Sequence, residues 1–321
     1  MTREITYIEA VAEALNEEMA RDEDVVLFGE DVESFGGNFG ETAGLYEEYG
    51  GKRVRNTPLS EIGIAGMALG AAVGGLRPVG ELQFADFAAT AGDEIFNQIP
   101  KQPYVSGGKL TAPLTIFAPS GAGIGAGAQH SQSVQSWLGN VPGWVVVTAT
   151  TPYDAKGLFK SAIRDDNPVF FLPHKMLSET KGEVPEEEYT IPLGEASVEH
   201  AGDDVTVVAT QLMFHRAREA AANLDVDVEL INPRTFAPLD TDTIAASVEK
   251  TGKLVVVDET VERYGTQGHI ANEVVENHFF SLDAPPKTIG VKDVPIPFSP
   301  VLEQEVLPSV ERIQAGIESV L

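Results

Sequence analysis

One acidic side chain at the head of a long apolar stretch is the first candidate for chemistry. Glu61 is followed, from residue 62 to residue 76, only by Ile, Gly, Ala, Met, Leu and Val. The stretch is typical of one buried helix, with Ser60 at the N-cap position. A carboxylate in the first turn interacts favourably with the helix dipole, and many such acids have no further role. Because the helix body is apolar, we predict that Glu61 lies at the rim of a dry site, where a carboxylate can exchange protons with a ligand.

Glycines recur every four residues along the same stretch. Gly66, Gly70 and Gly74 leave part of the helix without side chains, so another backbone can pack closely against it. Each glycine costs about 1 kcal/mol of helix stability relative to alanine. The spacing therefore predicts a close packing partner along this helix.

A histidine in a glycine-rich segment is the second candidate. His130 ends the run Gly-Ala-Gly-Ile-Gly-Ala-Gly-Ala-Gln-His, residues 121–130. A lone histidine in a loop is commonly structural. Its charge changes near working pH, however, which suits proton transfer to a carbonyl or carbanion oxygen.

The same glycines offer a rival hypothesis, a nicotinamide dinucleotide site. Gly121, Gly123 and Ala126 follow a strand and fit the pattern G-x-G-x-x-G/A. That pattern also needs an apolar helix after the glycines and an acid about twenty residues further on. Polar residues follow instead, and no Asp, Glu, Lys or Arg occurs between Lys109 and Asp154. The dinucleotide hypothesis fails on both requirements.

The elements that must position these residues alternate between strands and helices. In the first half, Thr6 and Glu9 form a capping box before a helix that ends near Arg21. We also predict strands at 25–29, 79–84, 144–149 and 169–172, and helices at 58–76, 92–104 and 152–163. Glu30 and Asp31, directly after the first of these strands, are more simply solvated loop acids than a metal site.

The second half repeats the alternation after a linker predicted at residues 177–192. We predict strands at 205–209, 226–231 and 253–258, and helices at 214–224 and 241–250. The fold class is α/β, with two doubly wound, mostly parallel-sheet domains at residues 1–185 and 186–321.

Composition excludes several classes of protein. The absence of cysteine rules out disulfides, thiolate catalysis, iron–sulfur clusters and cysteine zinc sites. The N-terminus has no signal-peptide core, and residues 62–76 are too few and too rich in glycine to span a bilayer. We therefore expect a cytoplasmic protein.

The net charge of −27 argues against nucleic acid and anionic membranes as partners. The acidic residues are scattered and form no tail, as expected of a halophilic surface adapted to high salt. The alternative is an acidic face for a basic partner.

The residues around Glu61 resemble a known signature. Glu61, Gly66, Met67, Gly70 and Ala71 match the pyrimidine-domain pattern of thiamine-diphosphate enzymes. With Asn-Thr-Pro-Leu-Ser before Glu61, the segment resembles more narrowly the beta subunit of the 2-oxo acid dehydrogenase decarboxylase component, of the pyruvate and branched-chain type. The resemblance implies that Glu61 hydrogen-bonds the cofactor's aminopyrimidine ring and that the glycine helix packs against a partner subunit.

The resemblance also implies further site residues. Phe87 would lie against the pyrimidine ring, with Gln83 as a second cofactor-binding residue. Gly-Ala-Gln-His-Ser-Gln resembles the family's active-site histidine loop and makes His130 catalytic. A potassium ion would be held by main-chain and side-chain oxygens of Leu114, Ala162, Ile163, Asp165 and Asn167. The second domain resembles the transketolase C-terminal domain, and the segment 294–303 matches a tail that helps bind the acyltransferase core.

A missing motif implies a partner. The family's Gly-Asp-Gly and Asn motif for the diphosphate and Mg²⁺ has no match, because Gly92-Asp93 and Gly202-Asp203 are not followed by glycine. An alpha subunit would therefore hold the diphosphate and Mg²⁺ in an α2β2 heterotetramer, and this chain alone would be inactive. The complex would decarboxylate a 2-oxo acid and pass the acyl group to a lipoyl-bearing dihydrolipoyl acyltransferase. The alternatives are an acetoin dehydrogenase beta subunit and a non-catalytic docking scaffold.

Overall fold

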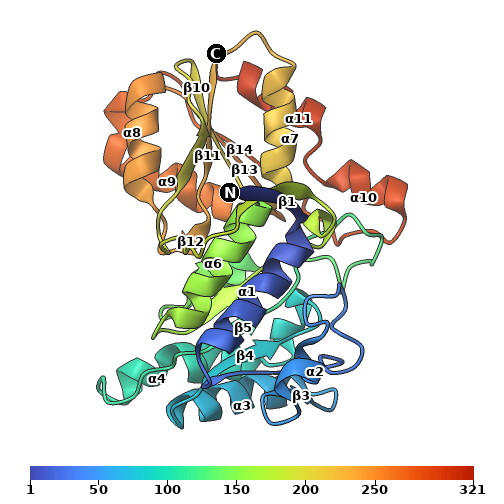
Figure 1. Ribbon diagram of the computed structural model, residues 1–321. Helices are drawn as coiled ribbons and strands as arrows, with labels where there is room; N and C mark the ends of the chain where they lie inside the picture. Colours follow the sequence, from blue (N-terminus) through green and yellow to red (C-terminus); the bar gives the residue numbers. More distant parts are fainter. The chain divides into compact units, whose positions relative to one another are not determined.

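The computed structural model describes residues 1–321, and the chain divides into two compact units (Figure 1). The first unit contains Met1–Ser120 and Trp137–Leu193, and the second contains Gly121–Ser136 and Gly194–Leu321. The segment that carries His130 is thus counted with the second unit, although the chain then returns to the first. No helix in the chain is long and apolar enough to cross a bilayer.

Parallel strands form the sheet of the first unit, in the order β6, β7, β5, β4, β2, β3. Their bounds are β2 Val25–Gly29, β3 Val54–Asn56, β4 Arg77–Glu81, β5 Thr115–Phe117, β6 Val145–Val147 and β7 Val169–Phe171. The strands are short and, except for the edge strand β3, almost wholly buried, as expected of a sheet that is covered on both faces. The predicted doubly wound α/β domain is confirmed.

Two helices of the first unit, α1 and α6, begin at capping boxes. Their bounds are α1 Tyr7–Arg21, α2 Leu45–Tyr49, α3 Glu61–Val73, α4 Ile99–Val105 and α6 Pro152–Arg164, with short turns η1 Ala85–Ala89, η2 Glu94–Gln98 and η3 Lys175–Leu177; α5, Gln135–Gly139, lies at the border of the units. The predicted capping box of α1 is present: Glu9 N–H donates to Thr6 Oγ1 at 3.2 Å and Thr6 N–H donates to Glu9 Oε2 at 2.7 Å. The predicted helix at 92–104 is confirmed as one continuous helical stretch, which is π-helical at Glu94–Gln98 and continues as α4.

The glycine-rich helix α3 is buried on one face only, so the prediction of a wholly buried helix is wrong. Ile64, Ala65, Ala68 and Ala72 are buried, and α3 packs beside β4. Ile62, Met67 and Val73 are exposed, and Leu69 and Ala71 are half-buried. Ser60 occupies the N-cap position as predicted, but its side chain makes no capping hydrogen bond.

A strand replaces part of the predicted linker. Residues Lys181–Pro185 form β8, which pairs antiparallel with the N-terminal strand β1, Thr2–Thr6. The two strands are far apart in sequence, and their exposed, polar residues carry no strong period-two pattern. The predicted domain limit at residue 185 coincides with the end of β8, and the first unit continues to Leu193.

The second unit is built on a five-stranded sheet in the order β14, β13, β10, β11, β9. Its strands are β9 Ser197–His200, β10 Val205–Ala209, β11 Val228–Asn232, β13 Leu254–Val261 and β14 Lys287–Val291; β12 is Thr235–Ala237. All neighbours are parallel except β9, which pairs antiparallel with β11. The predicted strand at 205–209 matches β10, whereas β9, β12 and β14 were not predicted.

Helices cover both faces of this sheet. They are α7 Gln211–Ala222, α8 Thr241–Thr251, α9 Thr266–His278, α10 Pro300–Val306 and α11 Val310–Glu318, with a short turn η4 at Phe279–Ser281. In Figure 1, α8 and α9 lie on one face, and α7 and α11 lie on the other. The core under α7 and α11 is a continuous apolar cluster that includes Val207, Phe214, Val257 and Ile313.

Candidate active site

Glu61 is the first residue of α3, and it faces a second acid at the end of β2. Glu30 follows β2 directly and is 5% exposed. Burial, and then the charge of Glu61, raise the pKa of the Glu30 carboxyl. Glu30 is therefore a buried acid beside the predicted catalytic carboxylate, rather than the solvated loop acid that was expected. No three acidic or histidine side chains are grouped as metal ligands in residues 1–321.

Two further buried acids, Glu41 and Glu81, lie in this unit, and the sequence analysis missed both. Glu81 ends β4, and Glu41 belongs to the loop after β2; each is 1% exposed. Apolar side chains of Leu27, Val79 and Phe117 surround the pair. Burial and then the charge of Glu41 raise the pKa of Glu81 well above its usual range, and burial also raises the pKa of Glu41. Each of the two groups therefore keeps its proton to a higher pH than an ordinary glutamate does.

The predicted ring-binding residues Gln83 and Phe87 follow β4 on the same unit. Both side chains are half-buried. Phe87 lies edge-on to Phe84, with ring centroids 5.6 Å apart, and the ammonium group of the buried Lys175 lies 5.0 Å from the Phe84 ring. Strand β4 thus places an amide and aromatic rings after its carboxyl end, where parallel sheets bind ligands.

The outward face of α3 carries exposed apolar side chains and glycines. Ile62 is 48% exposed, Met67 is 43% exposed and Val73 is 40% exposed. A Cβ added at Gly70 would meet no atom within 4 Å, whereas one at Gly66 would lie 3.3 Å from a carboxylate oxygen of Glu94. The predicted groove is therefore open at Gly70 and is closed at Gly66 by this chain's own side chain.

His130 lies in a loop whose amides are occupied by carboxylates of the same unit. Glu259, at β13, accepts a hydrogen bond from Ala122 N–H at 2.5 Å. Glu303, on α10, accepts from Gly123 N–H at 2.8 Å and from Gly125 N–H at 3.0 Å. A pyrophosphate bound to these amides would meet two negative charges, which is a physical reason against the dinucleotide hypothesis.

The C-terminal end of the segment 121–136 is also held by hydrogen bonds. Gln135 Nε2 donates to the two oxygens of the buried carboxylate of Asp258, at 2.9 and 3.0 Å, and Thr266 Oγ1 donates to the same group at 2.6 Å. Burial raises the pKa of Asp258. The side chain of His130 is half-buried, and its backbone N–H donates to Gly127 O at 3.3 Å. Glu61, Gln83 and Phe87 belong to the first unit and His130 to the second.

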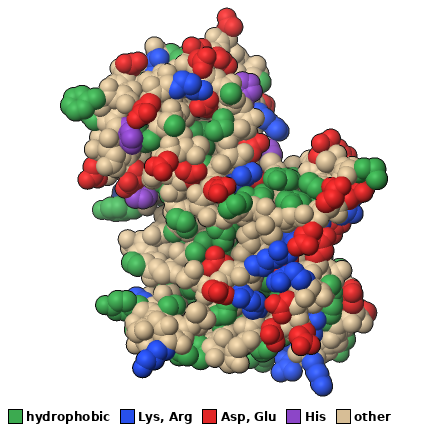
Figure 2. Space-filling view, turned by 60° about the vertical axis from the view of Figure 1, so that its left-hand side comes forward, with side chains coloured by type: hydrophobic (Ala, Val, Ile, Leu, Met, Phe, Trp, Pro, Cys, Tyr) green, Lys and Arg blue, Asp and Glu red, His purple; other side chains and the backbone are tan.

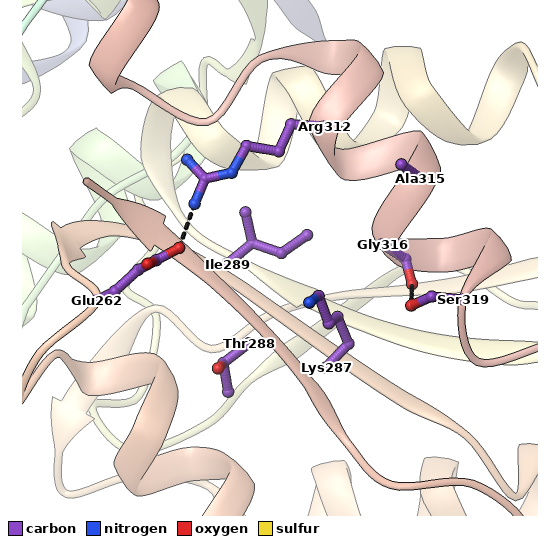
Figure 3. Close-up of a pocket in the computed structure, with 8 residues that line it drawn as sticks. All are labelled: Glu262, Lys287, Thr288, Ile289, Arg312, Ala315, Gly316 and Ser319. Atoms are coloured by element: carbon purple, nitrogen blue, oxygen red, sulfur yellow. Dashed lines mark hydrogen bonds and ion pairs between the residues drawn. The ribbon is translucent and has the colours of Figure 1, made fainter.

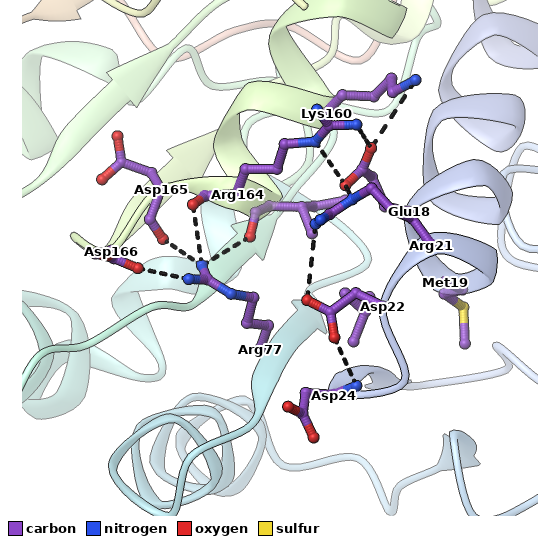
Figure 4. Close-up of polar contacts among 12 residues, drawn as sticks. Glu18, Met19, Arg21, Asp22, Asp24, Arg77, Lys160, Arg164, Asp165 and Asp166 are labelled. Atoms are coloured by element: carbon purple, nitrogen blue, oxygen red, sulfur yellow. Dashed lines mark hydrogen bonds and ion pairs between the residues drawn. The ribbon is translucent and has the colours of Figure 1, made fainter. Parts of the chain in front are cut away.

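Ala162, Ile163, Asp165 and Asn167, four of the residues predicted to hold potassium, lie at or just after the C-terminal end of α6, where an arginine already lies (Figure 4). The fifth, Leu114, directly precedes β5. Arg77 Nη1 donates to the carbonyl oxygens of Ile163, Arg164 and Asp165 at 3.3, 3.1 and 3.0 Å. Its Nη2 donates to Asp166 Oδ1 at 2.5 Å. Arg77 therefore places a positive charge on two of the predicted ligands, and it would compete with a potassium ion for them.

A cavity in the second unit contains none of the predicted site residues (Figure 3). It has a volume of about 250 Å³ and lies between β14 and α11. The Arg312 guanidinium at its rim is already paired with Glu262. The charge of the chain as a whole is dispersed, and Figure 2 shows acidic side chains scattered over the face in view, with basic ones between them.

Comparisons with known proteins identify the domains and the fold of the chain. Residues 3–180 match the model of the transketolase pyrimidine binding domain, and residues 194–313 match that of the transketolase C-terminal domain. A solved structure described as a split gene transketolase, inactive beta4 tetramer, aligns with a TM-score of 0.82 at 23% identity over 99% of this chain and 98% of its own. That likeness shows the fold.

Three curated relatives from Bacillus subtilis (strain 168) are similar over almost the whole chain. The acetoin:2,6-dichlorophenolindophenol oxidoreductase subunit beta is 44% identical over 98% of this chain and 96% of its own length. The pyruvate dehydrogenase E1 component subunit beta is 43% identical over 92% of each chain. The 2-oxoisovalerate dehydrogenase subunit beta is 41% identical over 98% of this chain and 97% of its own. This chain therefore belongs to the family of beta subunits of thiamine-diphosphate-dependent 2-oxo acid dehydrogenases, of the pyruvate and branched-chain type.

Proposed function

We propose that this chain is the pyrimidine-holding half of a 2-oxo acid decarboxylating enzyme, and that an alpha subunit completes the site. The observation that carries the proposal is Glu61 at the start of a helix whose outward face is apolar and open at Gly70. Such a face is suited to a second chain, and a carboxylate at its edge would then be enclosed between the two.

The donors of the first unit fit the ring half of the cofactor. Glu61 offers a carboxylate that would share a proton with a ring nitrogen, Phe87 offers an aromatic surface, and Gln83 offers an amide. Thiamine diphosphate, when bound, supplies the carbanion and electron-sink chemistry for decarboxylation of a 2-oxo acid. Burial and the charge of Glu61 raise the pKa of Glu30, so Glu30 keeps its proton to a higher pH than an ordinary glutamate does.

His130 would act in the last step, transfer of the acyl group to a lipoyl arm, by holding or donating a proton at the reacting oxygen. The lipoyl-bearing acyltransferase would bind at the tail 294–303. Phe298 and Val301 in this tail are 75% and 73% exposed, as a docking segment requires.

The complete enzyme would be an α2β2 heterotetramer with Mg²⁺ and the diphosphate on the alpha side. Its potassium site would share carbonyl oxygens with Arg77. A cytoplasmic location and adaptation to high salt remain predictions from the sequence.

The decisive experiment is reconstitution with the alpha subunit. The isolated chain should show no turnover, and the co-purified complex should oxidise a 2-oxo acid with 2,6-dichlorophenolindophenol as acceptor only when thiamine diphosphate is present. Glu61→Gln should lower the rate by about 10²- to 10⁴-fold if Glu61 acts in acid–base catalysis. An unchanged rate would reject the role of Glu61, and thiamine-independent docking without turnover would favour the scaffold.

Three substrates should be compared in that assay: pyruvate, 3-methyl-2-oxobutanoate and acetoin. The identities to the corresponding relatives are 43%, 41% and 44%, which do not separate them. We expect the highest kcat/KM for one of the two 2-oxo acids. Turnover of acetoin alone would identify an acetoin dehydrogenase instead.

A further inference from the structure

We propose that Glu303 is a positioning residue for His130, because its buried carboxylate organises the glycine loop that carries the histidine. The inference rests on the proposed role of His130 in acyl transfer. Glu303 lies almost at the other end of the sequence, on the short helix α10.

The first support is the bonding of the carboxylate. Glu303 is 0% exposed, and each of its oxygens accepts one backbone N–H, from Gly123 at 2.8 Å and from Gly125 at 3.0 Å. A buried charge without partners is strongly unfavourable, and charge-assisted hydrogen bonds are about twice as strong as neutral ones. The pair of bonds therefore holds the loop and the carboxylate in one mutual geometry.

The second support is the backbone of the loop. Gly123, Gly125 and Gly127 have φ values of +115°, +69° and +76°, a region that favours glycine. Successive amides in such turns point toward a common anion. A segment so rich in glycine has many alternative conformations, and an anion in its concavity selects one of them. Here that anion is the side chain of Glu303.

The third support is the short connection to the histidine. The backbone N–H of His130 donates to Gly127 O at 3.3 Å, so the loop ends in a turn that contains His130. Gly127 also lies against Phe298, just before α10, since a Cβ there would be 3.6 Å from the Phe298 ring. Displacement of the loop at Gly123 and Gly125 would therefore be passed to the backbone of His130.

The test uses Glu303→Gln, Glu303→Asp and the control Glu305→Gln in the complex with the alpha subunit. Glu305 lies on the same helix and is exposed. Two rates are measured: dye-coupled oxidation, which does not need His130 in the proposed mechanism, and acylation of a free lipoyl domain, which does. The free lipoyl domain lacks the acyltransferase core that the tail 294–303 would bind, so a loss of docking through that tail does not enter either rate. Glu303→Gln should lower lipoyl acylation by about 10²-fold, the cost of a misplacement near 1 Å, and leave the dye-coupled rate within about threefold. Glu303→Asp should recover part of the loss.

The double variant with His130→Ala separates positioning from general stability. If Glu303 acts through His130, then Glu303→Gln should cause no further loss of lipoyl acylation in the His130→Ala background. Equal losses in both assays, or the same further loss without the histidine, would overturn the proposal.

A direct measurement keeps this inference separate from the proposed function. Hydrogen exchange of the peptide that covers residues 121–130 in the folded complex should be faster in Glu303→Gln and unchanged in Glu305→Gln. If His130→Ala leaves lipoyl acylation intact, the role of His130 fails, while faster exchange would still show that Glu303 organises the loop. Unchanged exchange in Glu303→Gln would reject the inference itself.

Discussion

Glu41 and Glu81 meet inside the first unit as two buried carboxyl groups. The carboxylate of Glu41 accepts a hydrogen bond from Phe39 N–H at 2.8 Å, and a Cβ at Gly37 would lie 2.6 Å from its carboxyl carbon. The loop thus wraps closely around Glu41, while Glu81 approaches from the sheet. This pair makes the stability of the first unit depend on pH.

We expect Glu81→Gln to lessen the loss of stability at alkaline pH. Burial and the charge of Glu41 raise the pKa of Glu81 in the folded chain, so the folded chain keeps a proton that the unfolded chain releases above about pH 4.3. The contribution of the pair is therefore full below that pH and is lost as the pH rises through the folded-state value. Urea unfolding at pH 5 and pH 8.5 measures this. If the free energy of unfolding of Glu81→Gln differs from that of wild type by the same amount at both pH values, the prediction is wrong. Glu48→Gln, at an exposed position, is the control.

Gly70→Ala should separate the stability of the chain from its assembly. The added methyl group meets no atom within 4 Å, and Ala is favoured over Gly in a helix by about 1 kcal/mol. The isolated chain should gain roughly that free energy of unfolding, whereas co-purification with the alpha subunit should weaken, and Gly70→Leu should abolish it. Denaturant titration and gel filtration measure the two effects. Undiminished assembly of Gly70→Leu would show that the glycine face is not an interface.

Arg77→Met should destabilise the first unit and test the potassium hypothesis. Hydrogen bonds to a charged group contribute about 1.5–3 kcal/mol, and three carbonyl oxygens at the end of α6 depend on Arg77. We expect a loss of about 2 kcal/mol in unfolding free energy. If potassium binds at Asp165 and Asn167, the melting temperature of the variant should rise in KCl relative to choline chloride. Equal melting temperatures in the two salts would remove potassium from this site.

Removal of salt should destabilise the protein if its surface is adapted to high salt. The net charge is −27, and the screening length grows from about 3 Å at 1 M to about 30 Å at 0.01 M salt. The melting temperature should fall steadily over this range. Substitution of sucrose for salt at low ionic strength should fail to restore it. A melting temperature independent of salt would reject the halophilic hypothesis.

Features that depend on neighbouring residues were predictable. The capping box of Thr6 and Glu9 and the buried strand at 205–209 match because a few adjacent side chains determine them. The type and spacing of Glu61 and the glycines likewise identified the family. The sequence analysis could not tell which face of α3 is covered, since its apolar residues lie all round the helix.

Only the tertiary structure decided which distant residues meet. Residues 181–185 were predicted as a linker. They form a strand only by pairing with the N-terminal strand, which is far away in the sequence, and no local pattern reveals that pairing. Glu41 and Glu81, and likewise Glu303 and the glycine loop, were missed because nothing in their local sequence marks them as a pair. The sequence by itself determined the local elements and the family to which the chain belongs. Folding decided which acids are buried and which groups they contact, because burial and pKa depend on neighbours that the order of residues in the chain does not reveal.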